Sequence, residues 1–356
     1  MEDDPVAPLA LSAGEGHTAF LLGGVLFTLG SNERGALGTP LADGVRAQVS
    51  FEQPFVDVTV ASSSACALDD SGTVHCWGAN DDGQVGVGTV EDVSTPSPIL
   101  FALRGKRLGD SSFNHHCLIA ADDSLWCWGL NTEDQVGRVD PRGGISNVPS
   151  AVMPEFRWRD VSAGGGHTLA IREDGTLWCW GRNTTDECGL GEDAPGRIFP
   201  PEQVGVEQDW QRVSATQSGS CGLRSGGALF CWGENSSGQV EQDPSESAPT
   251  PVLIVGTWRD FDIGTFHTCG VDINDELWCW GRAIEGQLGL PSSDVNRPSR
   301  FSTGLDDVLS VDVGRFHSCA QQRSGRVLCT GDNRRQQLGL EEPGVVNEFF
   351  EIERPR

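Results

Sequence analysis

The sequence predicts an all-β protein, a seven-bladed β-propeller with four-stranded blades, and three observations predict it. We take the glycine of each Cys-Trp-Gly element, or its equivalent, as the marker of a repeat. Six of the seven markers are followed by a second glycine eight residues later, and Glu241 stands at that position in the other repeat. Six are followed by an Asn two residues later, with Ala283 as the exception. The composition of 46 Gly, 19 Pro, 11 Trp and no Tyr favours many short strands and tight turns. Seven markers recur every ~50 residues, the period of a repeat architecture, at Gly30, Gly78, Gly129, Gly181, Gly233, Gly281 and Gly331.

Each repeat contains short apolar runs that indicate strands. In the fourth repeat, residues 158–163 form the first run, and the next two runs flank Glu173-Asp174-Gly175, a hairpin signal in which Gly175 supplies the positive φ of the turn. Later runs at 249–254 and 348–352 add a fourth strand. A blade buries both faces of its sheet only when neighbouring blades pack on it, so we expect a closed ring.

The ring is expected to form one domain over residues 9–356. Residues 1–8 are then a linker that remains after a leader has been removed. The N-terminus itself lacks the basic region and apolar core of a signal peptide, so export requires that Met1 replaces such a leader.

The repeat strings resemble a known family. Residues 264–269, 277–281 and 286–289 match the regulator of chromosome condensation repeat, and the resemblance covers residues 9–352. It implies a seven-bladed propeller, and we identify the chain with the bacterial secreted type of that family. Relatives serve nucleotide exchange, ultraviolet sensing, β-lactamase inhibition and scaffolding, so the resemblance implies a fold and not one activity.

One family activity is disfavoured by the residues themselves. Ultraviolet-sensing relatives carry a tryptophan directly after the glycine of the Gly-x-x-His string. The corresponding residues here are Glu15, Gly165, Thr265 and Arg315, and none is aromatic. A tryptophan-based light sensor is therefore not expected.

Ten of the twelve cysteines form pairs ten residues apart, one member on each strand of the predicted hairpin. Cross-strand neighbours lie close enough for a disulfide, whereas zinc sites usually combine two close-spaced pairs, and these pairs lie on different blades. We predict structural disulfides, with buried free thiols and metal binding as alternatives. The pairs are Cys66 with Cys76, Cys117 with Cys127, Cys221 with Cys231, Cys269 with Cys279, and Cys319 with Cys329.

Cys179 and Cys188 depart from this spacing. Leu169 stands opposite Cys179, and Cys188 replaces the Leu or Val that precedes the second glycine. They form a possible sixth pair within the fourth repeat, because that Leu or Val position is expected to fold back on its own blade. Disulfides at this density imply an oxidising compartment.

Most histidines and all tryptophans recur in register, which favours structural roles. Five histidines share one repeat position, where we expect the imidazole to bond the backbone of the adjoining blade: His17, His115, His167, His267 and His317. His75 and His116 are outside this register and show no partner pattern. The tryptophans are expected to pack within or between blades.

Function in a repeat scaffold is expected where the copies differ. The two residues before the repeated His vary most, and in a propeller they lie in loops around one end of the channel. Aromatic and Arg side chains there resemble interface anchors, although the aromatic rings could instead pack under neighbouring loops. The candidate partner-binding residues are Phe113, Asn114, Phe266, Arg315 and Phe316.

Charge excludes several partners. The chain carries 25 Lys and Arg against 51 Asp and Glu, a net charge of −26, and Lys106 is the only lysine. Nucleic acid and anionic membrane surfaces both require clustered cations, so neither is expected as a partner. The most apolar stretch, residues 19–30, is shorter than the ~20 residues of a membrane span.

We predict an exported, non-enzymatic binding or scaffold propeller, a monomer that engages an extracellular or periplasmic protein through the loops at one end of the channel. Its localisation is then extracellular, periplasmic or at the cell surface. No catalytic, cofactor or metal motif is found in the sequence, so none of these sites is predicted. The alternatives are an enzyme with its site at the channel mouth or around Cys179 and Cys188, and a protein similar to β-lactamase inhibitors.

Overall fold

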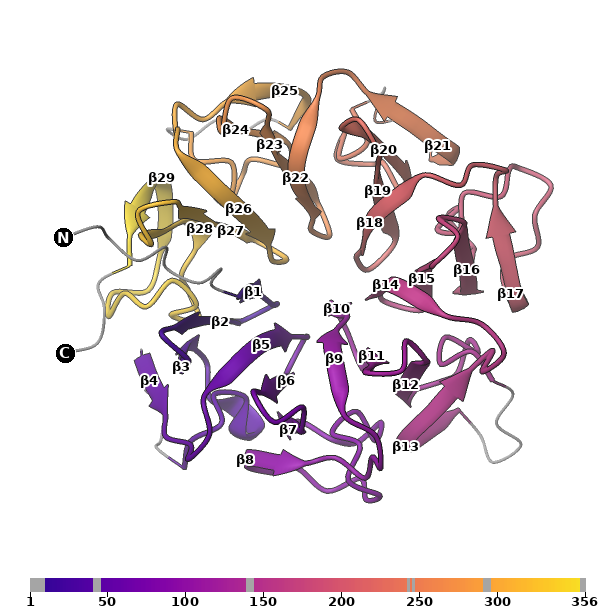
Figure 1. Ribbon diagram of the computed structural model, residues 1–356. Helices are drawn as coiled ribbons and strands as arrows, with labels where there is room; N and C mark the ends of the chain where they lie inside the picture. Colours follow the sequence, from indigo (N-terminus) through magenta and orange to yellow (C-terminus); the bar gives the residue numbers. More distant parts are fainter. Residues whose placement is uncertain are drawn as a thin grey trace, which may run out of the picture.

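Seven sheets, each with four antiparallel strands, surround a central axis, which confirms the predicted propeller (Figure 1). The computed structural model describes residues 10–40, 46–138, 144–241, 244, 247–290 and 296–352. The predicted linker, residues 1–8, lies outside the described residues. In the ring, the first strand of each blade lies nearest the axis and the last strand forms the rim.

The four antiparallel strands of each blade come from one continuous stretch of chain. Blade one contains β1 Leu11–Ala13, β2 His17–Leu22, β3 Val25–Gly30, the short 3-10 helix η1 Glu33–Gly35, and β4 Arg46–Val49. Blade two contains β5 Phe55–Val60, β6 Ser64–Asp69, β7 Val74–Gly78 and β8 Val93–Pro98. Blade three contains β9 Gly105–Leu108, β11 His115–Ala120, β12 Leu125–Leu130 and β13 Ile145–Val152.

The remaining blades repeat this order. Blade four contains β14 Trp158–Ala163, β15 His167–Arg172, β16 Leu177–Arg182 and β17 Arg197–Val204; blade five contains β18 Trp210–Ala215, β19 Gly219–Arg224, β20 Ala228–Gly233 and β21 Ala248–Ile254. Blade six contains β22 Trp258–Ile263, β23 His267–Asp272, β24 Leu277–Gly281 and β25 Arg297–Ser302; blade seven contains β26 Val308–Val313, β27 His317–Gln322, β28 Val327–Asp332 and β29 Val345–Glu351.

One strand crosses between blades. The two-residue strand β10, Asp110–Ser111, follows β9 of blade three but pairs in parallel with β14 of blade four, with Asp110 opposite Ser162. Asp110 occupies the innermost-strand position that is Thr59 in blade two, Ser214 in blade five, Asp262 in blade six and Asp312 in blade seven. Among the described strands, no sheet combines segments from both ends of the chain.

The cysteines lie as the spacing predicts. In five blades the two cysteines are direct cross-strand partners and are joined by a disulfide. These five bonds connect Cys66 with Cys76, Cys117 with Cys127, Cys221 with Cys231, Cys269 with Cys279, and Cys319 with Cys329. All ten side chains are completely buried, and the structure has the disulfide pairs that the spacing predicts.

The two irregular cysteines are also paired. Cys179 and Cys188 form the sixth disulfide, so the loop residue folds back on its own blade as predicted. No free cysteine remains among the twelve, all of which lie in the described ranges.

The tryptophans of the Cys-Trp-Gly element connect neighbouring blades. Each is fully buried, and its indole N–H donates a hydrogen bond to a backbone carbonyl of the preceding blade, as Trp280 does to Gln239 at 2.8 Å. Trp77 makes the same bond to Ala36 at 2.9 Å. Burial of a large ring together with its polar group explains why the position repeats.

The histidines also connect blades, but through a different partner from the one predicted. His115 bonds the Thr168 hydroxyl of the next blade at 2.8 Å, not its backbone. The hydroxyl itself donates to the Gln135 carbonyl at 2.7 Å, so the imidazole Nε2–H must be the donor to Thr168. Burial lowers the pKa of His115 to about 3, which keeps the ring neutral.

Equivalent imidazole–hydroxyl bonds join three more pairs of blades. They are His167 with Ser220, His267 with Ser318, and His317 with Thr18. Of the five histidines in register, only His17 bonds a backbone group, on Ser64, as the prediction has it.

His116 follows the same rule with the two residue types exchanged. It occupies the hydroxyl position of blade three and bonds Ser64, which occupies the histidine position of blade two, at 3.0 Å. The prediction that His116 has no partner pattern is therefore wrong. Blade five has Gly219 at the histidine position, so the contact between blades five and six lacks this bond.

Candidate functional site at the channel mouth

The loops that follow the innermost strands surround one mouth of the channel. Five blades meet there around a space of about 30 Å³, lined among others by Glu15, Phe113, Gln217, Thr265 and Arg315. This space holds about one or two waters. Side chains therefore close the channel at this end. A partner larger than a few waters would contact the mouth as a surface and would not enter it as a pocket.

Three of the predicted residues gather on one side of this mouth. The rings of Phe266 and Phe316 stack with centroids 5.4 Å apart. The Arg315 guanidinium lies 5.2 Å from the Phe316 centroid and forms a 3.1 Å ion pair with Glu15 of blade one. Blades one, six and seven thus contribute to a single cluster of two aromatic rings and charged groups, which we call the Arg315 cluster.

Arg282 adds a second guanidinium to the Arg315 cluster. It lies 5.2 Å from the Phe266 centroid. Hydrogen bonds to the Glu285 carboxylate at 2.6 and 2.8 Å raise the pKa of Arg282 above its ordinary value. Both rings are half-buried, and about a third of the Arg282 and Arg315 side chains remains exposed. The cluster is therefore ordered before any partner arrives and still partly accessible.

Phe113 and Asn114 lie apart from the Arg315 cluster. Phe113 lines the narrow space from blade three, and its backbone carbonyl accepts a hydrogen bond from the Ser62 N–H. The Asn114 amide donates to Asp82 at 2.8 Å. The structure therefore brings Phe266, Arg315 and Phe316 together, places Phe113 at the same mouth, and engages Asn114 in a bond between loops.

Two contributors to the cluster were missed at the sequence level. Glu15 belongs to the variable loops but carries no aromatic or basic group, and Arg282 lies outside them, directly after the marker Gly281. Arg182 occupies the same position in blade four and bonds Ser218 of the next mouth loop at 3.0 Å. An arginine after the marker glycine is therefore the signal that could have found Arg282.

Below the mouth, charges of opposite sign alternate around the channel wall. One position of the innermost strand holds Asp57, Arg107, Asp160, Arg212 and Asp260 in consecutive blades. Arg107 forms a 2.7 Å ion pair with Asp160, and Arg212 pairs with Asp260. Each arginine bonds the carboxylate of the following blade, so these charges join neighbouring innermost strands.

The aspartates also bond the backbone of the next blade. Asp160 accepts the Val213 N–H at 2.8 Å, and Asp260 accepts the Val311 N–H at 2.9 Å. Two residues further along the innermost strand, Asp312 accepts the Ala13 N–H at 2.7 Å and so connects the last blade to the first. These carboxylates are occupied in joining innermost strands, which favours a structural role over acid–base chemistry.

Burial changes the ionisation of several wall residues. It raises the pKa of Asp262 to about 7, with the charge of Asp110 acting in the same direction. It also raises the pKa of Asp312 well above its ordinary value, with Asp262 as the next contributor. Within the described ranges, no three His, Cys, Asp or Glu side chains lie close enough together to hold a metal ion.

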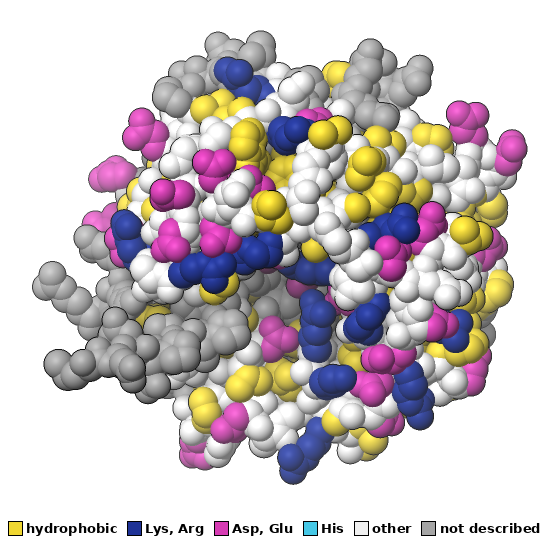
Figure 2. Space-filling view, turned by 45° about the horizontal axis from the view of Figure 1, so that its top comes forward, with side chains coloured by type: hydrophobic (Ala, Val, Ile, Leu, Met, Phe, Trp, Pro, Cys, Tyr) yellow, Lys and Arg dark blue, Asp and Glu magenta, His cyan; other side chains and the backbone are white. Residues whose placement is uncertain are grey.

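The outer surface is less uniformly acidic than the net charge indicates. Figure 2 shows Lys and Arg side chains gathered near the middle of one face, with Asp and Glu beside them. Most Arg side chains are in ion pairs, as Arg34 is with Asp81 and Asp92. Among the described helices, none is long and apolar enough to cross a bilayer.

Comparison with known proteins identifies the repeat. Two models of the regulator of chromosome condensation (RCC1) repeat match residues 55–84, 158–189, 210–239 and 308–337, and residues 71–108, 122–171 and 274–321. Together they cover more than half of the chain. The chain belongs to the RCC1 repeat family. The predicted family is confirmed, while the bacterial secreted type stays a prediction.

Curated relatives of this RCC1-repeat chain have different names and lengths. The chain is 29% identical over 283 residues to a human protein described as a probable E3 ubiquitin-protein ligase, HERC6, covering 73% of this chain and 27% of that protein. It is 30% identical over 259 residues to the ultraviolet-B receptor UVR8 of Arabidopsis thaliana, covering 67% and 57%. The chain thus spans about a quarter and just over half of these two relatives.

Solved structures share the fold at low identity. Human WBSCR16 superposes with a TM-score of 0.82 at 19% identity, over 93% of this chain and 95% of that one. Yeast RCC1 (Prp20), in a structure with Kap60, superposes with a TM-score of 0.80 at 18% identity, over 98% and 85%. At such identity these likenesses support the fold alone.

Proposed function

We propose that the chain is a binding or scaffold propeller that engages a protein partner through the channel mouth, with the Arg315 cluster as the centre of the contact. The observation that carries this proposal is the ordered, partly accessible set of Phe266, Phe316 and Arg315 at the place where the repeats differ most. Arg and aromatic side chains held rigid before binding lose little entropy on association, which makes them suitable anchors.

Two features support a binding role over an enzymatic one. The space at the mouth is about 30 Å³, well below the roughly 300 Å³ at which pockets begin to bury small-molecule ligands. Cys179 and Cys188, the residues on which the alternative active site depended, are buried and joined in a disulfide. A reactive cysteine requires an accessible thiolate.

The proposed compartment is an oxidising one, with the protein partner outside the cytoplasm. Six disulfides support it, because reducing compartments keep such thiols free. Alkylation mass spectrometry on protein taken from its native compartment tests this part. Six intact disulfides are expected, and a majority of free thiols would contradict the localisation without touching the interface proposal.

The interface is tested by chemical crosslinking in extracts of the source cells and their medium, followed by mass spectrometry. The wild-type chain is compared with Phe316→Ala, Arg315→Ala and the control Val206→Ser, whose side chain is 83% exposed far from the mouth. We expect one set of partners to be crosslinked by wild type and control and to be lost, at least tenfold, from both mouth variants. Equal recovery with all four proteins would overturn the proposal.

A further inference from the structure

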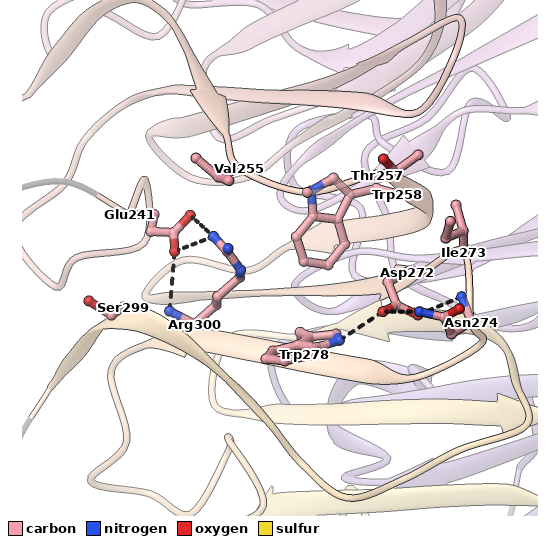
Figure 3. Close-up of a pocket in the computed structure, with 11 residues that line it drawn as sticks. Glu241, Val255, Thr257, Trp258, Asp272, Ile273, Asn274, Trp278, Ser299 and Arg300 are labelled. Atoms are coloured by element: carbon pink, nitrogen blue, oxygen red, sulfur yellow. Dashed lines mark hydrogen bonds and ion pairs between the residues drawn. The ribbon is translucent and has the colours of Figure 1, made fainter.

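A second cavity lies between blades five and six, away from the channel mouth (Figure 3). Its volume of about 500 Å³ lies within the roughly 300–1,000 Å³ range of small-ligand pockets. Trp258 is the first residue of β22, and the mouth loop 264–266 follows the last residue of that strand. The cavity therefore opens at the opposite end of the strand from the Arg315 cluster.

Two tryptophans and two polar groups dominate this cavity. Figure 3 shows Trp258 and Trp278 with the Glu241–Arg300 pair on one side and Asp272 with Asn274 on the other. The Trp278 indole N–H lies 3.3 Å from the Asp272 carboxylate. Val255 and Ile273, both more than 60% exposed, form an apolar rim around the entrance.

The neighbouring blades show what this arrangement accepts. In blade five, the Arg224 guanidinium lies 5.5 Å from the Phe230 centroid and 5.8 Å from that of Trp210. In blade four, Arg172 lies 3.8 Å from the Phe156 centroid and 5.4 Å from that of Trp178. In blade five a guanidinium of the chain itself therefore lies over the two rings that correspond to Trp258 and Trp278, held by cation–π attraction. In blade four it lies over Trp178, the counterpart of Trp278, and over Phe156, whose position is Gly256 in blade six.

Blade six has the same aromatic site without the internal guanidinium. The cross-strand partner of the first tryptophan is Arg172 in blade four and Arg224 in blade five, whereas Trp258 is paired with Asp272. Among the described residues, no Lys or Arg lies over the ring of Trp258 or Trp278. A carboxylate thus stands in the register position at which the two neighbours supply a cation.

Glu241 keeps the nearest cation of the cavity away from the rings. It replaces the second repeat glycine and has a φ of 56°, in the left-handed region that favours glycine. Its carboxylate binds Arg300 through two contacts of 2.7 and 2.9 Å. The Arg300 charge is thereby neutralised at the wall. The Asp272 carboxylate accepts N–H bonds from Asn274, Glu276 and the Trp278 indole, and among the described residues no Lys or Arg forms an ion pair with it, so its negative charge is not balanced by a cation.

We propose that this cavity binds the guanidinium group of an arginine side chain on a basic peptide segment of a partner. The guanidinium would lie against Trp258 and Trp278, as Arg224 lies over Trp210 and Phe230 in blade five. It would also pair with the Asp272 carboxylate. The net charge of −26 attracts such a segment over a distance. This inference is independent of the channel mouth and of the function proposed for it.

Calorimetric titration with three blocked tripeptides tests the proposal. Acetyl-Gly-Arg-Gly-amide is compared with the citrulline peptide, which has nearly the same shape but no charge, and with the lysine peptide. We expect the arginine peptide to bind with a Kd of about a millimolar, as two or three weak contacts allow, and the citrulline peptide to bind at least tenfold more weakly. Equal binding of the citrulline or the lysine peptide would overturn the guanidinium assignment.

Two variants locate the site. Asp272→Arg introduces the arginine that blades four and five carry at this register position, so the blade is expected to fold and to lose binding of the peptide. Asp272→Asn preserves the shape and can still accept the Asn274 N–H bond of 2.8 Å, and it is expected to weaken binding at least fivefold. Asp174→Asn, in the corresponding turn of blade four, is the matched control. Undiminished binding by Asp272→Asn would overturn the proposal, whether or not Asp272→Arg folds.

Discussion

In blade six, Cys269 and Cys279 are opposite each other on β23 and β24 and are joined by a disulfide, whereas blade one has Ala19 opposite Thr28 at that position. Both hairpins nevertheless have the same strand pairing. In blade one, Phe20 and Phe27 stack with centroids 5.4 Å apart, and Ala19 and Thr28 are completely buried. Apolar contact is thus enough to form this hairpin, and the disulfides add stability to a blade whose shape does not depend on them.

The two blades also differ in how they contact the preceding blade. Trp280 fills the contact between blades five and six and donates to Gln239, whereas blade one has Leu29 at the same position against blade seven. Blade one compensates with the hydrogen bond between Thr18 and His317 of blade seven. The contact between blades five and six has no such bond, because Gly219 stands at the histidine position of blade five. Each contact between blades therefore combines a buried side chain with a polar bond, and which of them dominates varies around the ring.

The largest expected effect comes from giving blade six the residue of blade one. Trp280→Leu leaves a cavity and removes the bond to Gln239, and we expect it to lower the free energy of unfolding by about 3 kcal/mol. Denaturant titration measures it. Trp126→Leu, at a half-buried position of blade three, is the control and is expected to cost less than half as much. Equal losses would mean that packing between blades five and six is no more important than a surface contact.

Removal of the blade-six disulfide should cost less. Cys269→Ala with Cys279→Ala is expected to lower the free energy of unfolding by about 2 kcal/mol, below the ~3 kcal/mol of a free loop of this length, because the hairpin already holds its ends together. The far-ultraviolet circular dichroism spectrum is expected to stay unchanged. A loss of strand signal would contradict the inference from blade one that the hairpin forms without the bond.

Blades six and one are both joined to blade seven through buried carboxylates, Asp262 and Asp312. The pKa of Asp262 is raised to about 7 in the folded state, so the folded chain retains a proton that the unfolded chain has lost above about pH 4. Stability contributed by this group therefore falls as pH rises from about 4 to about 7.

Asp262→Asn removes this pH-dependent loss. Its amide oxygen can still accept the Val313 N–H, which bonds the carboxylate at 2.6 Å. We expect the variant to gain roughly 1–3 kcal/mol relative to wild type at pH 8, and much less at pH 5. Denaturant unfolding at both pH values measures the difference, and a gain that is the same at pH 5 and pH 8 would exclude a shifted Asp262.

The smallest expected effect is the reverse exchange, a disulfide added to blade one. Ala19→Cys with Thr28→Cys places two thiols at direct cross-strand positions, and a gain of about 1 kcal/mol is expected after the Thr28 hydroxyl bond to Leu37 is lost. Alkylation mass spectrometry should detect a seventh disulfide. Two free thiols in oxidised protein would show that the hairpin of blade one differs from those of the other blades.

Periodic features were predictable from the sequence because the ring repeats them. The marker glycines located every hairpin, and the ten-residue cysteine spacing gave the cross-strand pairs. Cys188 was linked to Cys179 because the residue before the second glycine, such as Leu288, packs on its own blade. In each case one repeat contains the whole interaction, so its residues are close in sequence.

Contacts between repeats were not predictable in the same way. The bond between His115 and Thr168 joins residues 53 positions apart, and the sequence does not show which side chain of the next blade lies against the imidazole. The cavity around Trp258 is lined by Glu241 from blade five and by Arg300 from blade six. The only sign of Glu241 in the sequence was that it replaces the second repeat glycine. Register within a blade follows from spacing, whereas register between blades requires the packed ring.

Because the four antiparallel strands of every blade come from one continuous segment, the boundary between blades seven and one is closed by side chains and backbone bonds alone, including Asp312 with Ala13 and Arg46 with Gly339. The ring has no covalent connection at this point, and any other interblade loop could take its place as the opening. The topology therefore permits circular permutation: a peptide joining residues 352 and 10, with new termini in another exposed loop, leaves every strand pair intact.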